Sequence, residues 1–304
     1  MPQATRDIKR RIKSVTNTKK VTKAMQMVAA AKMRKAVANV LASRSYAVLA
    51  WELVKKLAER TNAKYHPLLA TRPQIKKIGL VLITSNRGLC GGFNNAIINT
   101  AIKFVRQQQA DLGVEADLVV MGKKGRDVMV KSGQNIIADF EKLDVTTAIE
   151  EIRPLVKLLI SDYLTGKLDK VMIAYTDFIS TLAQKPRILQ LLPLQSQDDD
   201  KYLGQAKHDQ AEVKQVMAEA EYLFEPTADK VLRDLLPRML ETKMYQAILE
   251  SDASEHSSRM VAMQNATDAA KDMISDLTLI FNKARQGSIT AELADISGGR
   301  AALE

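Results

Sequence analysis

The residues best suited to chemistry lie in a glycine-rich segment, Gly88-Leu89-Cys90-Gly91-Gly92. This segment follows an apolar run typical of a strand and precedes a helical pattern, the position that a phosphate-binding loop takes in nucleotide-binding domains. It does not fit G-x-G-x-x-G, and the chain has no G-x-x-x-x-G-K-[ST] motif. A tight turn is the favoured interpretation, with nucleotide binding as the alternative. Gly122-Lys123-Lys124-Gly125 has the same two interpretations.

Other reactive side chains form no recognisable constellation. Cys90 is the single cysteine and has no histidine near it in sequence, which argues against a thiol nucleophile. The three histidines, His66, His208 and His256, are far apart, and no Cys/His spacing fits a metal site. Three aspartates at 198–200 could bind a cation, but a solvated loop is the favoured interpretation. The sequence therefore predicts no catalytic residues, no metal and no cofactor.

Composition narrows the class of protein. The chain has 304 residues, 46% of them hydrophobic, and a net charge of +10, so it is neither disordered nor collagen-like. A single cysteine excludes a disulfide scaffold and favours a reducing compartment. The apolar runs are shorter than the roughly 18 residues of a membrane span, and the N-terminus lacks an apolar signal core. We therefore expect a soluble, cytoplasmic protein that can be attached to something larger.

Glycine and proline, which interrupt helices, are concentrated in the middle of the chain. Residues 3–66 and 238–286 contain neither. Such stretches predict two helical rods of roughly 90 Å and 70 Å, and uninterrupted patterns of this length favour a coiled coil. The C-terminal rod carries a heptad stripe, with alternating spacings of four and three residues: Leu249, Ala253, His256, Met260, Met263, Thr267, Ala270, Ile274, Leu277, Phe281 and Ala284.

The N-terminal rod is less regular. Its predicted seam begins with Ile8, Ile12 and Val15, and continues through a second patch and then two further residues: Val21, Met25, Val28, Val37 and Leu41. The central part alternates strand and helix signals, which is typical of an open α/β sheet. The predicted strands are 78–84, 116–121, 170–176 as a third parallel strand and 187–192 at the edge, with helices at 94–109 and 147–164 and a turn at 122–125 leading into another helix.

The predicted fold class is α/β plus long helices: an antiparallel coiled coil of the N- and C-terminal helices with a central Rossmann-like α/β domain. The expected boundaries are 1–66 for the N-terminal helix, 67–194 for the α/β domain, 195–226 for a polar loop and foot segment, and 227–304 for the C-terminal helix.

Charge is concentrated on the first helix. Residues 1–66 contain 16 Lys or Arg and three acidic residues, a net of +13. Such a helix could bind nucleic acid, an anionic membrane or an acidic protein, or could present a solvated face. A basic coiled-coil nucleic-acid-binding protein is therefore one functional alternative, although the helix has few aromatic residues and no base-reading motif.

Four segments carry a family resemblance: NTKKVTKAMQMVAAAKM at 17–33, SNRGLCGG at 85–92, RMVAMQNAT at 259–267 and NKARQGSITAEL at 282–293. In this order they resemble the gamma subunit of the rotary F-type ATP synthase, in its bacterial form without the paired regulatory cysteines of chloroplasts. The resemblance implies a non-catalytic rotor shaft that couples ion flow through a membrane c ring to ATP synthesis or hydrolysis in the beta subunits.

The resemblance also implies partners and contact residues. The expected partners are the alpha and beta subunits, the epsilon subunit and the c ring, without nucleic acid. Membrane association is expected only through the complex, at the cytoplasmic face of the bacterial cell membrane. The implied beta-subunit contacts are Lys20, Lys23, Met25, Arg285 and Gln286, and the implied foot contacts to epsilon and the c ring are Tyr222, Leu223, Phe224 and Glu225. A polar loop at 197–218 is longer than the usual bacterial version.

Overall fold

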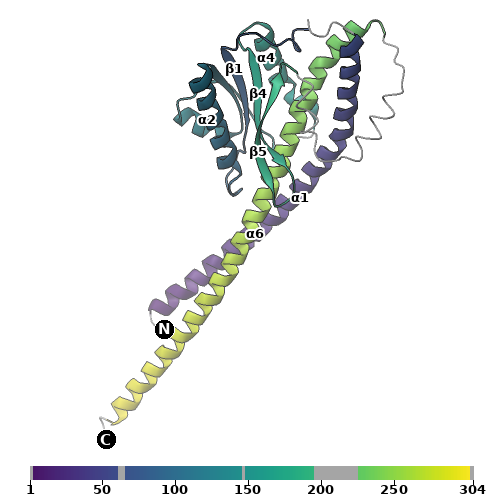
Figure 1. The fold of residues 1–304 in the computed structure, drawn as a ribbon. Coiled ribbons are helices and arrows are strands. Elements are labelled where there is room, and N and C mark those ends of the chain that lie inside the picture. Colours follow the sequence, from purple (N-terminus) through teal and green to yellow (C-terminus); the bar gives the residue numbers. More distant parts are fainter. Residues whose placement is uncertain (1–2, 61–65, 146–147, 195–224, 302–304) are drawn as a thin grey trace. The chain divides into compact units, whose positions relative to one another are not determined.

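A computed structural model of the chain describes residues 3–60, 66–145, 148–194 and 225–301 (Figure 1). The expected loop 197–218 therefore lies outside the described residues. The chain forms two compact units, one made of residues 1–30 with 259–304 and the other of residues 31–258. Two long helices contribute to both: α1 (Gln3–Arg60) and α6 (Ala228–Ala301). The expected fold class, long terminal helices with a central α/β sheet, is confirmed.

The first unit is an antiparallel pair of helical segments, one from each long helix (Figure 1). The C-terminal heptad stripe is confirmed here, because its members from Met260 to Ala284 are all buried or half-buried. Residues between them on α6, such as Lys271 and Asp272, are exposed. The spacing of three and four residues thus identifies the packed face of α6.

The N-terminal seam differs from the prediction. Val21 and Val28 are 59% and 55% exposed, whereas Thr22 and Ala29 are 8% and 2% exposed. Leu41 is also exposed. The packed positions of α1 follow a heptad spacing. Thr22 and Ala29 fall on these positions, whereas the neighbouring Val21 and Val28 do not. The positions of α1 that follow this heptad spacing are all buried or half-buried: Thr5, Ile8, Ile12, Val15, Lys19, Thr22, Gln26, Ala29, Met33, Ala36 and Val40. The predicted Met25 and Val37 are half-buried beside them.

A hydrogen bond between two threonines fixes the pairing of the two segments. Thr267 Oγ1 donates to Thr22 Oγ1 at 2.8 Å, and Thr22 Oγ1 donates to the carbonyl of Lys19 at 3.1 Å. Both threonines are buried in the seam. A polar contact inside an apolar seam favours one register, because a shift of either helix would break the hydrogen bond between the two hydroxyls.

The second unit contains a five-stranded sheet with the order β3-β2-β1-β4-β5. Four strands are parallel, and β5 runs antiparallel to β4 at one edge. The four predicted strands are confirmed, and β4 is parallel as expected. The strands are β1 (Lys77–Ile83), β2 (Glu115–Met121), β3 (Ile136–Phe140), β4 (Lys170–Phe178) and β5 (Gln184–Leu192).

Three details of the α/β region depart from the prediction. The strand β3 was not predicted, so β4 is the fourth strand rather than the third. The helix α3 (Lys123–Lys131) begins directly after Gly122, so most of the expected turn is helical. The expected helix 147–164 is a 3-10 turn, η2 (Ile149–Ile152), followed by α4 (Arg153–Leu164). Pro154 lies in the first turn of α4, where a missing N–H breaks no helical hydrogen bond.

The sheet is covered on both faces. On one face, α2 (Phe93–Leu112) and Met129 of α3 pack against Ile78, Leu80 and Leu82. On the other, Val81 and Ile83 belong to a larger apolar cluster formed with α4, residues 50–57 of α1 and residues 232–248 of α6. Alternate residues of β1 thus pack into the apolar clusters on opposite faces of the sheet, as expected for a parallel strand that is buried on both faces.

A half-buried carboxylate, Asp169, links the residue that precedes β4 to the start of β1. Asp169 accepts hydrogen bonds from Arg72 Nη1 at 2.8 Å and from the backbone N–H groups of Lys76 and Lys77 at 2.8 and 3.0 Å. Burial alone would raise the pKa of Asp169, but these donors outweigh it and hold the pKa below its usual value. The carboxylate is therefore ionised at neutral pH.

Asp169→Asn should lower the free energy of unfolding at neutral pH by about 1–2 kcal/mol, because a neutral amide oxygen accepts these hydrogen bonds less strongly. Since the pKa of Asp169 is lowered in the folded chain, this stabilisation is present at neutral pH and is lost as the pH falls through that pKa. Urea denaturation at neutral and strongly acidic pH should show the two stabilities converging in acid. Asp111→Asn, at an exposed carboxylate of α2, is the control, and a difference independent of pH would contradict the account.

Candidate interaction surfaces

The glycine-rich loop after β1 is held by contacts with its own neighbours. The Ser85 N–H donates to Asn94 Oδ1 at 3.0 Å, and Ser85 Oγ donates to the carbonyl of Arg87 at 2.6 Å. Asn86 Nδ2 donates to the carbonyl of Lys142 at 2.6 Å. Gly91 has a φ of +56°, a conformation that favours glycine. The geometry supports the tight-turn interpretation of this segment.

The candidate nucleophile and metal ligands do not come together in the described part of the chain. Cys90 is buried and its Sγ accepts a hydrogen bond from Asn94 Nδ2 at 3.2 Å. Among the described residues, no group of three His, Cys, Asp or Glu side chains could hold a metal ion. His256 Nε2 bonds the carbonyl of Asp144 at 2.6 Å, which makes it a packing residue of α6. His208 and the aspartates at 198–200 lie outside the described residues.

The basic side chains of α1 face outward in the first unit. Arg6, Lys9, Arg10, Arg11, Lys13, Lys20 and Lys23 are all exposed. Within the described ranges none of the seven forms an ion pair, and Lys23 Nζ instead donates to Gln26 Oε1 at 3.2 Å. Cations presented in this way attract anionic surfaces over about a Debye length, roughly 8 Å at physiological salt.

The expected beta-subunit contacts lie at two places along the coiled coil. Lys20 and Lys23 are exposed on α1 with Met25 half-buried beside them, and Arg285 and Gln286 are exposed on α6. Thr22 pairs with Thr267, so residue 285 lies 18 residues further along α6, about 27 Å away. The structure does not bring the two groups into one site. Both are accessible to partners.

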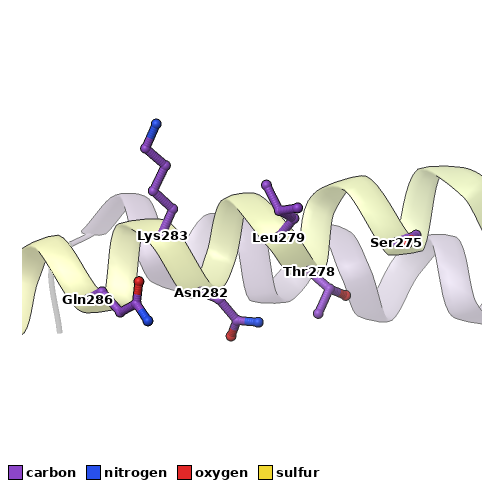
Figure 2. A pocket seen from close by; sticks show the side chains of 6 residues that line it. All are labelled: Ser275, Thr278, Leu279, Asn282, Lys283 and Gln286. Atoms are coloured by element: carbon purple, nitrogen blue, oxygen red, sulfur yellow. The ribbon is translucent and has the colours of Figure 1, made fainter.

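A shallow groove marks the surface next to Gln286. It has a volume of about 610 Å³ and is lined by α6 alone, as Figure 2 shows for Ser275, Thr278, Leu279, Asn282, Lys283 and Gln286. Leu279 is 69% exposed there. One face of one helix cannot enclose a small molecule, so this surface suits a protein partner.

Of the expected foot contacts, Glu225 is exposed just before α6, while Tyr222, Leu223 and Phe224 lie outside the described residues. None of the helices in the described ranges is both long and apolar enough to cross a membrane.

Comparison with known proteins identifies the family. The sequence model of a family described as ATP synthase matches residues 4–303. The ATP synthase gamma chain of Chloroflexus aurantiacus is 42% identical over 305 residues, covering 100% of this chain and 99% of that one. The chain belongs to the ATP synthase gamma chain family. The gamma chain of Legionella pneumophila is 39% identical over 299 residues, with 98% and 99% covered.

Solved structures share the gamma chain fold. A structure of the OSCP, F1 and c-ring part of the Euglena gracilis mitochondrial ATP synthase includes a chain with a TM-score of 0.65 at 18% identity, covering 99% of this chain and 94% of that one. The central stalk and c ring of the Tetrahymena thermophila enzyme includes one with a TM-score of 0.59 at 23% identity, covering 81% and 99%. The solved structures thus confirm the fold, while the sequence matches confirm the family resemblance inferred from the motifs. The nucleic-acid-binding alternative finds no support among these relatives.

Proposed function

We propose that this chain is the central shaft of an F-type ATP synthase, turning inside a hexamer of alpha and beta subunits and carrying no active site of its own. The observation that carries the proposal is the match to gamma chains over nearly the full length, in a chain whose two ends form paired long helices. The chain would join the c ring and the epsilon subunit through its foot segment. It would lie at the cytoplasmic face of the bacterial membrane, held there through the complex.

The physical properties of the two helices support this role. A rotating shaft must resist bending and twisting, and continuous helices of 58 and 74 residues are suited to that task. Exposed cations along α1 fit acidic beta-subunit surfaces that are met in turn during each rotation. Screened charge attraction is reversible, whereas a large apolar interface would hold the shaft in one position.

Reconstitution tests the proposal directly. The purified chain is mixed with alpha and beta subunits, and complex formation and ATP hydrolysis are measured. We expect a stable complex with hydrolysis well above that of alpha and beta alone. Failure to form a complex, with no added activity, would contradict the proposal.

Arg285→Ala should lower the affinity of the alpha–beta hexamer for this chain by about tenfold or more, because losing a charge-assisted hydrogen bond costs about 1.5 kcal/mol or more. Assembly and steady-state rotation are the measurements. Lys271→Ala is the matched control, since Lys271 is also an exposed cation on α6 but does not line the groove next to Gln286. Arg285→Lys should recover only part of the effect because an ammonium lacks the guanidinium's fork of donors. Unchanged assembly and rotation in Arg285→Ala would remove this residue from the contact.

A further inference from the structure

One segment of α6 in the second unit buries polar side chains where the rest of the helix buries apolar ones. From Leu232 to Leu249 the buried positions are mostly Leu, Met, Ile and Ala. In the next eight residues all side chains are buried and Ala253 is the single apolar one. The polar ones are Glu250, Ser251, Asp252, Ser254, Glu255, His256 and Ser257.

At the centre of this segment is a buried lysine from the α/β domain. Lys142 follows β3, and its Nζ lies 2.6 Å from Asp252 Oδ1 and 2.7 Å from Glu255 Oε2. The exposed fractions of the three side chains are 2%, 0% and 7%. Burial alone would lower the pKa of Lys142, but the two carboxylates outweigh it and hold the pKa above its usual value. The lysine therefore stays charged inside the protein.

Further polar contacts hold the same segment from the other side. Ser254 Oγ donates to the carbonyl of Thr176 in β4 at 3.1 Å, and Ser257 Oγ donates to that of Thr181 in the β4–β5 hairpin at 2.6 Å. Ser258 Oγ donates to Gln184 Oε1 of β5 at 3.0 Å. Helix α6 is thus held between the residues after β3 and the residues around the β4–β5 hairpin.

Apolar packing and polar contacts respond differently to a force that pushes α6 sideways against the sheet. The hydrophobic effect is non-directional, so a small displacement of a helix that keeps its apolar side chains buried loses little of it. Ion pairs and hydrogen bonds depend on distance and angle, and a buried lysine separated from its carboxylates loses the partners that offset its desolvation. The polar segment therefore has one strongly preferred position against the sheet.

We propose that Lys142, Asp252 and Glu255 form a clamp that keeps α6 from slipping against the α/β domain when torque passes between them. This inference rests on the proposed function, because torque reaches the chain only within a rotary complex. Lys142 would be a positioning residue: it contacts neither nucleotide nor transported ion, and acts by making domain and shaft turn together.

The test replaces the whole clamp with apolar side chains of similar size, Lys142→Met with Asp252→Leu and Glu255→Met, in the complete ATP synthase reconstituted in vesicles. ATP hydrolysis and ion transport are measured together. We expect hydrolysis close to that of the unaltered enzyme, while ions transported per ATP fall about twofold or more, the result expected once the slipped state is populated as often as the aligned one.

Lys32→Met is the matched control. Lys32 forms an ion pair of 2.7 Å with Asp144, two residues after Lys142, but the two side chains are 34% and 50% exposed. An exposed pair contributes little, so coupling should be unchanged. If both variants lower the transport ratio equally, the buried clamp has no special role.

The outcomes separate this inference from the proposed function. If the unaltered chain does not assemble or couple, the proposed function fails. If it couples and the triple variant couples equally well, the clamp inference fails. If the triple variant does not assemble, Asp252→Asn is used instead, because it keeps the Lys142–Glu255 pair while weakening the clamp. A smaller fall in transport per ATP is then expected, and an unchanged ratio overturns the inference.

Discussion

Gly122→Ala is expected to destabilise the α/β unit by about 3 kcal/mol or more. Gly122 has a φ of +107°, which L-residues rarely adopt, and an added Cβ would lie 2.2 Å from the backbone oxygen of Thr84. That oxygen cannot move freely, because Thr84 N–H donates to the Met121 carbonyl at 2.8 Å and continues the pairing of β1 with β2. Backbone strain at position 122 and the clash with Thr84 therefore both destabilise the variant. Urea denaturation of the full chain should show the loss as a lower midpoint.

Two other glycines separate the contributions. Gly113 has a φ of +63° with nothing within 4 Å of an added Cβ, so Gly113→Ala should show strain alone, about 1 kcal/mol. Gly88 has open space and no such φ, so Gly88→Ala should be nearly neutral. If Gly122→Ala is no more destabilising than Gly113→Ala, the close approach of β1 and α3 contributes nothing and the clash account is wrong.

The long helices could be predicted because the absence of glycine and proline is visible directly in the sequence. A stretch of residues 3–66 without glycine or proline leaves few ways to end a helix, and α1 extends over Gln3–Arg60. The second stretch without glycine or proline, 238–286, is shorter than its helix, since α6 passes through Pro237 and Gly287. Near Pro237, the buried Leu236 and Met239 hold the helix against the core. Packing of this kind outweighs a local propensity penalty.

Strand prediction succeeded for the four strands that contain fully buried residues and failed for β3, which contains none. The strand β1 is buried at six of its seven positions and gives a continuous apolar run. The strand β3 has only half-buried and exposed residues, with Asp139 among them, so its sequence gives no such run. It lies at the edge of the sheet, where one side of the strand has no neighbouring strand among the described residues. An edge strand leaves a weaker apolar signal than a central one.

The packed faces show the limit of reading hydrophobicity alone. Val21 was assigned to the seam because it is apolar, yet Thr22 takes that place and pairs with Thr267. The polar segment after Leu249 was hidden for a related reason, because buried acids and serines look like a solvated helix face. Its key partner, Lys142, is 113 residues away from Glu255 in sequence. Pairing over such a distance depends on the sheet topology, which no local pattern contains.

Lys142→Met alone is expected to lower the free energy of unfolding by about 3–5 kcal/mol, because it leaves Asp252 and Glu255 buried without their cation. The methionine fills similar space, so little of this loss would come from a cavity. Since the pKa of Lys142 is raised in the folded chain, the ion pairs stabilise it below the unfolded pKa of about 10.4 and lose this effect as the pH rises through the folded pKa. Urea denaturation at neutral pH is the measurement.

The triple apolar variant distinguishes charge from packing in the same measurement. Removing all three charges takes away the buried lysine together with both of its carboxylate partners, so Lys142→Met with Asp252→Leu and Glu255→Met should recover most of the stability lost in the single variant. If the triple variant is as unstable as Lys142→Met, the loss comes from packing and the buried-charge account is wrong. Recovery of stability together with lost coupling would instead mean that these charges are kept for the position they enforce on α6, since an apolar clamp would hold the fold equally well.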